Sequence, residues 1–216
     1  MRAARWDRLV PLGGVVFVVL AVAGNALQGS TPAPHADARE AAEFYSDKPV
    51  MISVGMTLSL ISLFFLAWFL AALGRSLRRA EVNDSWLSTT ASGGGVAAIS
   101  LLAAGFALNS LGALRAKARG SIPPETAAVF YDGGLALTGL AAPLALAILL
   151  APTAVVALRS DVFPPWFGWV TAALAVLGLV TPVSFILFLL FPVWVLVTSI
   201  LLYRGEVRAS VLSSRP

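Results

Sequence analysis

Two similar phrases hold most of the side chains that could do chemistry in this chain. Residues 40–47 read EAAEFYSD and residues 125–132 read ETAAVFYD, each just before a long apolar run. Carboxylates that act as general acid and base must converge in a cleft that shifts their pKa values. Because both phrases lie outside the apolar runs, near water, we interpret them as matched outer caps whose aromatic rings anchor at the membrane surface. The alternative is an outer rim in which the two phrases face each other around a mouth or partner site; its members are Glu40, Tyr45, Asp47, Glu125, Tyr131 and Asp132.

Composition excludes most other chemistries. The chain has no cysteine, which removes thiolate metal sites and iron–sulfur clusters, and the single histidine, His35, cannot form a histidine-rich metal site within one chain. No nucleophile elbow, P-loop, H-E-x-x-H or dinucleotide fingerprint is present. The basic residues cluster at the ends of apolar runs, a pattern of membrane orientation and not of nucleic-acid binding. We therefore expect a non-enzymatic protein with no catalytic residues, no metal, no cofactor and no nucleic-acid partner.

The apolar runs define the fold class. The chain is 58% hydrophobic and only 12% charged, whereas soluble domains carry about 25% charged residues. A membrane helix needs roughly 20 apolar residues, and the sequence predicts an all-α membrane bundle forming one domain over residues 1–216. The six predicted transmembrane helices are residues 9–27, 50–73, 93–114, 135–158, 165–180 and 183–203, with outer segments at 28–49 and 115–134. The last two spans should form a tight helical hairpin around Thr181-Pro182.

The cations predict the orientation of these spans. Of the 15 Lys and Arg residues, ten flank the N-terminus, the second-to-third and fourth-to-fifth connections and the C-terminus, while five lie in the two outer segments. The larger group should face the cytoplasm of a bacterial plasma membrane, so both termini are expected inside. Within it, Arg75, Arg78 and Arg79 are candidates for contact with anionic lipid headgroups, although cations there also serve to fix topology.

A weak internal repeat relates the first four spans. Residues 13–27 (GGVVFVVLAVAGNAL) match residues 94–108 (GGVAAISLLAAGFAL) at an offset of 81, and the Phe-Tyr pair recurs at an offset of 86. A five-residue insertion in the second outer segment reconciles the two offsets. We infer a parallel duplication of a helix, outer segment and helix, which also favours retention of the first span over its removal as a signal peptide.

Local signals predict the shape of each outer segment. Asp37 and Glu40 suggest the start of a short helix that Pro49 ends, and Pro124 suits the first turn of a second helix that Gly133 and Gly134 should loosen. Two polar residues, Asn25 and Asn109, lie late in the first and third spans, where they could bond across helices or face a ligand pathway. The small residues of the third span form a seam for close helix packing; they are Gly93, Ala97, Ser100, Ala104 and Ala107.

Four stretches together resemble a set of uncharacterised actinobacterial integral membrane proteins of about this length. They are AREAAEFYSDKP, FFLAWFLAALGRSLRRAE, STTASGGGVAA and FPPWFGWV. This resemblance implies a six-helix bundle in the plasma membrane and brings no activity or functional residue with it.

The expected function follows from these patterns. The leading interpretation is an assembly or accessory protein that packs with lipids, with membrane-protein partners or with a copy of itself. The alternative is a small permease, channel or lipid-handling protein for a neutral molecule, because no span contains an ionisable side chain that could couple transport to protons. The helix-interrupting prolines Pro143, Pro152 and Pro192 could line such a pathway.

Overall fold

The described part of the chain is entirely helical. The computed structural model describes residues 10–33, 36–81, 86–160, 162–180 and 184–212. The N-terminal arginines, His35, and the Thr181-Pro182 turn lie outside these residues. The elements are the 3₁₀ turn η1 (Val10–Leu12), α2 (Gly13–Gln28), α3 (Ala38–Asp47), α4 (Pro49–Ala80), α5 (Trp86–Arg119), α6 (Pro124–Leu135), the π-helical segment η2 (Ala136–Ala141), α7 (Ala142–Arg159), α8 (Pro165–Leu179) and α9 (Ser184–Leu212).

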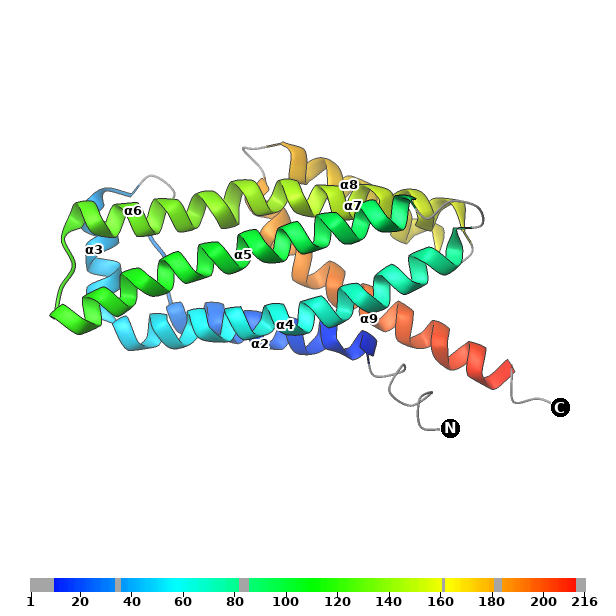
Figure 1. Cartoon of the computed structure of the whole chain (residues 1–216), viewed down its shortest axis with the longest axis horizontal. Helices are drawn as coiled ribbons and strands as arrows, with labels where there is room; N and C mark the ends of the chain where they lie inside the picture. Colours follow the sequence, from blue (N-terminus) through cyan, green and yellow to red (C-terminus); the bar gives the residue numbers. More distant parts are fainter. Residues whose placement is uncertain (1–9, 34–35, 82–85, 161, 181–183, 213–216) are drawn as a thin grey trace.

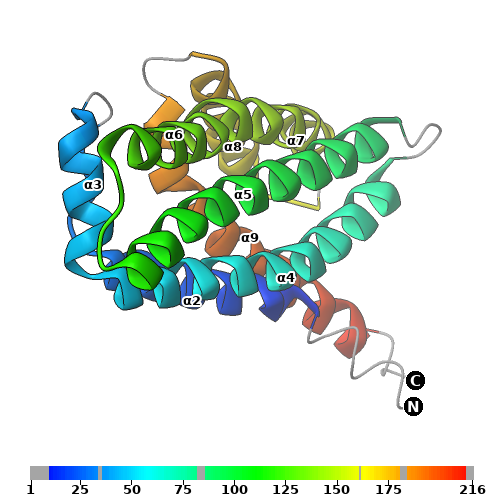
Figure 2. The same ribbon diagram turned by 60° about the vertical axis from the view of Figure 1, so that its left-hand side comes forward.

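Long neighbouring helices form the bundle. Helix α2 packs along α4, α4 along α5, α5 along α7, and α7 along α8, while α9 crosses the bundle obliquely and contacts α2 and α8 (Figure 1). The short helix α3 packs across α6 at one end, where α4 begins and α5 ends (Figure 2). We call this end, formed by α3, α6, the start of α4 and the end of α5, the cap.

Five helices of the described residues are long and apolar enough to cross a membrane, which places the chain among membrane-embedded proteins. They are Val10–Gln28, Pro49–Ala80, Trp86–Arg119, Pro124–Arg159 and Ile186–Gly205. Helix α8 covers the fifth predicted span, residues 165–180, and is equally apolar but only 15 residues long. At 1.5 Å per residue it reaches about 22 Å, short of the roughly 30 Å of a hydrocarbon core.

The helix ends that the cation pattern assigns to one side of the membrane lie at the same end of the bundle. Helix α2 starts, α4 ends, α5 starts, α7 ends and α9 ends on the side of the bundle away from the cap (Figure 1). The described cations of the larger group, in the last turns of α4 and α7 and in the second half of α9, therefore lie toward one end, and the two outer segments share the other. Which end faces the cytoplasm stays a prediction.

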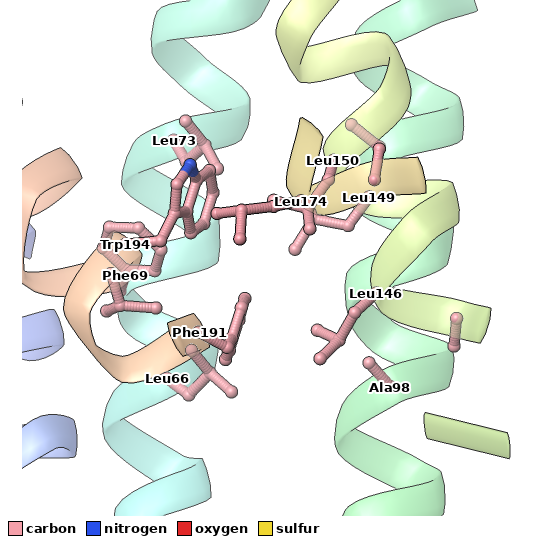
Figure 3. Packing of buried hydrophobic residues seen from close by; sticks show 14 of the residues in the cluster. Leu66, Phe69, Leu73, Ala98, Leu146, Leu149, Leu150, Leu174, Phe191 and Trp194 are labelled. Atoms are coloured by element: carbon pink, nitrogen blue, oxygen red, sulfur yellow. The ribbon is translucent and has the colours of Figure 1, made fainter. Parts of the chain in front are cut away.

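An aromatic cluster fills the centre of the bundle. Leucines of α4 and α7 meet Leu174 of α8 and Phe191 and Trp194 of α9 (Figure 3). The Trp194 ring lies edge-on to Phe69 with ring centres 6.2 Å apart, and it stacks on Phe191 at 5.7 Å. Its Nε1–H donates to Thr171 Oγ1 at 2.9 Å, so the buried indole is satisfied as a low-dielectric interior requires.

Glycine permits a close contact between two long helices, α5 and α7. A Cβ built on Gly94 of α5 would lie 2.5 Å from the Leu149 nitrogen and 2.7 Å from the Ile148 carbonyl carbon of α7. Gly94 therefore serves close packing against α7, and Gly95 lies against Leu70 of α4. The predicted small-residue seam is wrong as an internal contact, because Gly93, Ser100, Ala104 and Ala107 are exposed and only Ala97 is half-buried. The face used inside the bundle is the adjacent one, which includes Gly94, Ala98, Leu102 and Gly105.

The second outer segment differs from the expected shape. Instead of loosening at Gly133 and Gly134, the chain stays helical from Pro124 to Arg159 and widens into the π-helical segment η2 just before Pro143. Proline has no N–H to bond the carbonyl four residues earlier, which here belongs to Gly139. That carbonyl oxygen accepts from Ser184 Oγ of α9 at 2.8 Å. The hydrogen bond that the helix loses is therefore replaced from another helix, as is typical of proline in membrane helices.

Candidate functional site

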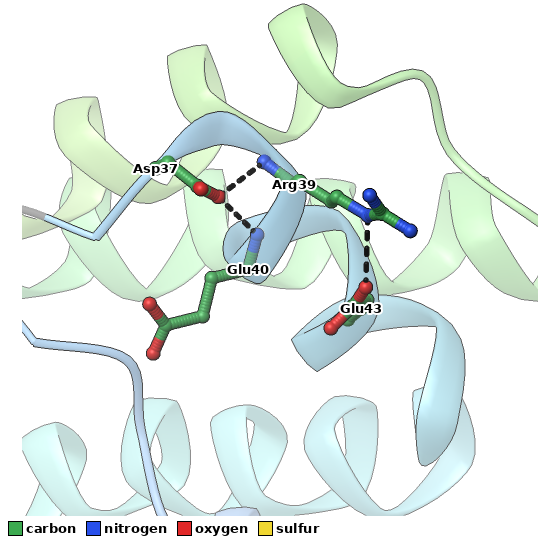
Figure 4. A network of polar contacts seen from close by, with 4 residues as sticks. All are labelled: Asp37, Arg39, Glu40 and Glu43. Carbon is green, nitrogen blue, oxygen red and sulfur yellow. Dashed lines mark hydrogen bonds and ion pairs between the residues drawn. The ribbon is translucent and has the colours of Figure 1, made fainter.

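The first outer helix is fixed at both ends by its sequence. Asp37 Oδ1 accepts from the backbone N–H groups of Arg39 at 3.0 Å and Glu40 at 2.8 Å, which satisfies two of the free donors at the start of α3 (Figure 4). Helix α3 ends at Asp47, and Pro49 is the first residue of α4. The predicted N-cap and stop are therefore confirmed, and Ala41, Ala42 and Tyr45 form its buried face.

Tyr45 is the buried centre of the cap. It is 0% exposed, and its hydroxyl donates to Asn109 Oδ1 of α5 at 2.8 Å. The Asn109 amide in turn donates to the Gly105 carbonyl oxygen at 3.1 Å. Gly112 makes room for the ring, since a Cβ there would lie 2.7 Å from Tyr45 Cζ. Two residues that the sequence singled out separately thus form one buried hydrogen-bonded pair.

Tyr131 joins the second phrase to the same cluster. It is buried, and its hydroxyl donates to the Pro32 carbonyl oxygen in the loop that follows α2. The Phe44 ring lies between the two tyrosines, with ring centres 5.2 Å from Tyr45 and 6.0 Å from Tyr131. The two Phe-Tyr pairs therefore meet, but inside the protein. Their tyrosines pack the cap instead of lying exposed at the headgroup level.

The carboxylates of the two phrases do not assemble around one mouth. Glu40, Asp47, Glu125 and Asp132 are all exposed. Glu40 and Asp47 line a cavity of about 310 Å³ beside α3, which neither Glu125 nor Asp132 lines. Figure 4 shows the Glu40 carboxylate turned away from the exposed ion pair between Arg39 and Glu43, whose N–O distance is 3.2 Å.

The cavity, which we call the outer cavity, lies between the end of α2, the loop after it and one side of α3. Phe44 and Ile52 form its apolar part. The complete lining is Gln28, Gly29, Ser30, Thr31, Pro32, Glu40, Glu43, Phe44, Asp47, Lys48 and Ile52. The bond from Tyr131 to Pro32 holds one wall of this cavity against α6. The outer cavity is the strongest candidate for a ligand site in the described residues.

Sequence reasoning missed Gln28. Its Nε2 donates to the Gly24 carbonyl oxygen at 3.1 Å, and Asn109 makes the same bond to Gly105, also at 3.1 Å. Both pairs of residues are 81 positions apart, which is the offset of the helix repeat. The matching sequences, residues 13–27 and 94–108, end immediately before Gln28 and Asn109. These two amides therefore occupy equivalent positions just beyond the repeat. Asn25, the amide that the sequence favoured, is exposed on α2.

The arginines after the second span lie at the opposite end of the bundle. Arg78 and Arg79 are exposed in the last turn of α4, and Arg75 is half-buried and has a partner. Next to them, the Glu81 carboxylate accepts from the backbone N–H of Leu87 at 3.1 Å and of Ser88 at 3.2 Å. Because a carboxylate is favoured at a helix N-terminus, Glu81 acts as the cap of α5. Contact of these arginines with anionic lipid stays a prediction.

The burial of Tyr45 predicts that the folded protein loses stability at alkaline pH. Burial, helped by the neighbouring Tyr131 and Asp132, raises the pKa of Tyr45 well above its usual value near 10. The neutral phenol is favoured in the folded cap, so this contribution to stability is complete below pH 10 and is lost as pH rises beyond it. We expect the melting temperature to fall above about pH 10, and the tyrosinate absorbance at 295 nm to rise as the cap opens and Tyr45 ionises. Tyr45→Phe should lower that absorbance step by the contribution of one of the three tyrosines; a step of unchanged height in this variant would contradict the assignment.

The outer cavity and a second, smaller cavity do not fit the predicted proline-lined pathway. The second cavity, of about 10 Å³, lies between α4, α5 and α7, and neither it nor the outer cavity is lined by Pro143, Pro152 or Pro192. In the described residues, no three His, Cys, Asp or Glu side chains lie close enough to hold a metal ion. Comparisons with protein-family models, curated proteins and solved structures find no match for this chain.

Proposed function

We propose that this protein is a non-enzymatic, multi-pass plasma-membrane protein that acts by assembling with another membrane helix, from a second copy or a partner protein. The observation that carries the proposal is the exposed seam of α5, formed by Gly93, Ser100, Ala104 and Ala107. Helix α5 lies between α4 and α7, and its outward face is not covered by another helix (Figure 1). Small residues allow backbones to approach closely in lipid, where packing replaces the hydrophobic effect as the force between helices.

The seam has no other role inside the chain. A Cβ on Gly93 would meet nothing within 4 Å, in contrast to Gly94 one position later. The one hydroxyl on the seam, Ser100 Oγ, donates to the Val96 carbonyl oxygen at 3.0 Å within its own helix. Among the described residues, this face therefore has no unsatisfied polar group, as suits a helix-docking face in lipid.

The proposal includes the topology and the duplication. We propose six spans with α8 as a short fifth, both termini cytoplasmic, and an internal repeat of the first four spans. The sorting of helix ends supports the first two points. The matched bonds of Gln28 and Asn109, 81 residues apart, support the third. A reporter fused after Arg119 should read periplasmic, and a cytoplasmic reading would overturn this topology.

A bulky substitution tests the seam. We expect Ala104→Phe to convert the assembled wild-type protein to a monomer in mild detergent, because the ring prevents close approach of a second helix. Size-exclusion chromatography with light scattering measures this mass. Ala151→Phe on the exposed side of α7 is the matched control and should leave the mass unchanged. A wild-type protein that is a clean monomer without a bound partner, or a control that dissociates equally, would contradict the proposal.

A further inference from the structure

Three exposed tryptophans lie at the end of the bundle away from the cap. Trp86 is the first residue of α5, and Trp166 and Trp169 lie in the first turns of α8 (Figure 1). Gly168 packs against Leu158 near the end of α7, which places the start of α8 at this end of the bundle. The three tryptophans are 61%, 52% and 69% exposed, in the same order. Tryptophan is enriched where a membrane helix leaves the hydrocarbon core, because its apolar body and its polar N–H both find suitable surroundings there.

The ring N–H groups of these tryptophans have no partner inside the protein. The buried Trp194 donates its Nε1–H to Thr171, whereas the exposed tryptophans have no acceptor for theirs in the described part of the chain. The hydroxyl of Tyr203, which is exposed on α9, has no partner there either. Lipid tails offer no acceptor, but the ester and phosphate oxygens of the headgroups do. We call these four residues the aromatic belt: Trp86, Trp166, Trp169 and Tyr203.

Four exposed arginines lie at the same end as the aromatic belt. Arg78 and Arg79 are in the last turn of α4, Arg159 ends α7 and Arg204 follows Tyr203 in α9. None of the four has an ion-pair or hydrogen-bond partner among the residues that the structure describes. The one carboxylate described at this end, that of Glu81, is bonded to the backbone at the start of α5. Unpaired positive charge beside amphipathic rings matches the headgroup layer of a leaflet that contains anionic phospholipid.

The other aromatic side chains do not form a comparable surface. The sequence favoured the Phe-Tyr pairs of the cap as anchors, but Tyr45 and Tyr131 are buried and their hydroxyls bond inside the protein. Trp68 is exposed, but it lies 12 residues before Ala80, the last residue of α4, and therefore about 18 Å along the helix. Its ring packs against Phe64 with ring centres 5.8 Å apart. Trp68 is thus placed at the depth of the lipid tails.

We propose that the aromatic belt and its four arginines bind the headgroup layer of a leaflet that contains anionic phospholipid. The indole N–H groups and the Tyr203 hydroxyl donate to ester and phosphate oxygens, and the guanidinium groups contact the anionic phosphates. This contact fixes the depth of α5 and of α8, which at 15 residues is too short to span the hydrocarbon core. The surface is separate from the α5 seam and requires no particular orientation of the bundle, so it stands or falls independently of the assembly proposal.

Quenching of tryptophan fluorescence by brominated lipids tests the depth of the belt. The full-length protein is reconstituted in phosphatidylcholine vesicles that carry bromine either near the headgroup end or near the methyl end of the acyl chain. We expect the first lipid to quench the wild-type protein more strongly. Combined Trp86→Phe, Trp166→Phe and Trp169→Phe should remove this preference, whereas the control Trp68→Phe should increase it. Equal quenching of the wild-type protein by the two lipids, or a preference that survives in the triple variant, would overturn the proposal.

The same measurement at low ionic strength tests the class of lipid. We expect brominated phosphatidylglycerol to be favoured over brominated phosphatidylcholine by at least about twofold. Combined Arg78→Gln, Arg79→Gln, Arg159→Gln and Arg204→Gln should abolish this selectivity. The matched control removes four exposed cations of the cap and should retain it; its changes are Lys48→Gln, Arg115→Gln, Lys117→Gln and Arg119→Gln. A wild-type protein that does not distinguish the two lipids, or an equal loss in the two quadruple variants, would count decisively against an anionic headgroup at the belt.

Discussion

Gly94→Ala should destabilise the protein by about 3 kcal/mol, at the upper end of the usual range for overpacking. The added methyl group would lie 2.5 Å from the backbone nitrogen of Leu149 and 3.0 Å from the Ala145 carbonyl oxygen. Backbone atoms cannot turn aside as a side chain can, so α5 and α7 must separate along their contact. Thermal unfolding in detergent, followed by tryptophan fluorescence, measures the loss.

The neighbouring glycine is the matched control. Gly93 occupies the same helix with open space around it, and alanine is favoured over glycine in a helix by about 0.5–1 kcal/mol. Gly93→Ala should therefore leave stability unchanged or raise it slightly. Equal losses in the two variants would show that α5 is sensitive to any substitution here, and not that Gly94 sets the distance to α7.

Tyr45→Ala should cost about 3–5 kcal/mol, the range for removing a large buried aromatic side chain. Tyr45→Phe keeps the ring and removes only the hydroxyl that bonds Asn109, so its cost should be about 1–3 kcal/mol. The cap should open locally first. Hydrogen exchange of the backbone amides of α3 and α6 should accelerate in both variants, more in the alanine variant, while α7 remains protected.

A double-mutant cycle isolates the bond between the two side chains. If Tyr45 and Asn109 act as a pair, the combined Tyr45→Phe and Asn109→Ala variant should lose less than the sum of the single variants. Strict additivity would contradict the pairing. Tyr131→Phe is the comparison at the other phrase, and its effect should appear at the loop that contains Pro32.

Apolar length predicted most of the helices. It acts locally, so five of the six predicted spans followed directly from the residues, as did the N-cap at Asp37 and the proline at the start of α4. The continuity of α6 with α7 did not, because this region packs against a residue 45 positions away, the Ser184 of α9 that donates to Gly139, and local sequence does not reveal such a contact. A pair of glycines in sequence indicates a weak helix, whereas tertiary packing here keeps the helix intact.

The candidate site was predicted only in part. The two matching sequence phrases identified Tyr45, Tyr131, Glu40 and Asp47 as candidates. They could not show which of these side chains are buried in the folded protein. The helical periodicity of α3 and α6 places the two tyrosines on the buried faces of these helices and the carboxylates on their exposed faces. The outer cavity could not be read from sequence, because its walls combine the end of α2 with α3 across a connecting loop. The repeat offset was the one signal that could have identified Gln28.

The hydrogen bond from Ser184 to Gly139 has a consequence for biogenesis. Pro143 cannot donate to the Gly139 carbonyl oxygen four residues earlier, and the donor that reaches this oxygen is on α9, which is synthesised later. Until α9 arrives, that carbonyl must be satisfied by water or by the insertion machinery, since lipid offers no donor. The hydrogen bonding of the helix from Pro124 to Arg159 is therefore completed only after α9 has been made. A chain truncated before Ser184 should accordingly be retained and degraded as an unfinished membrane protein.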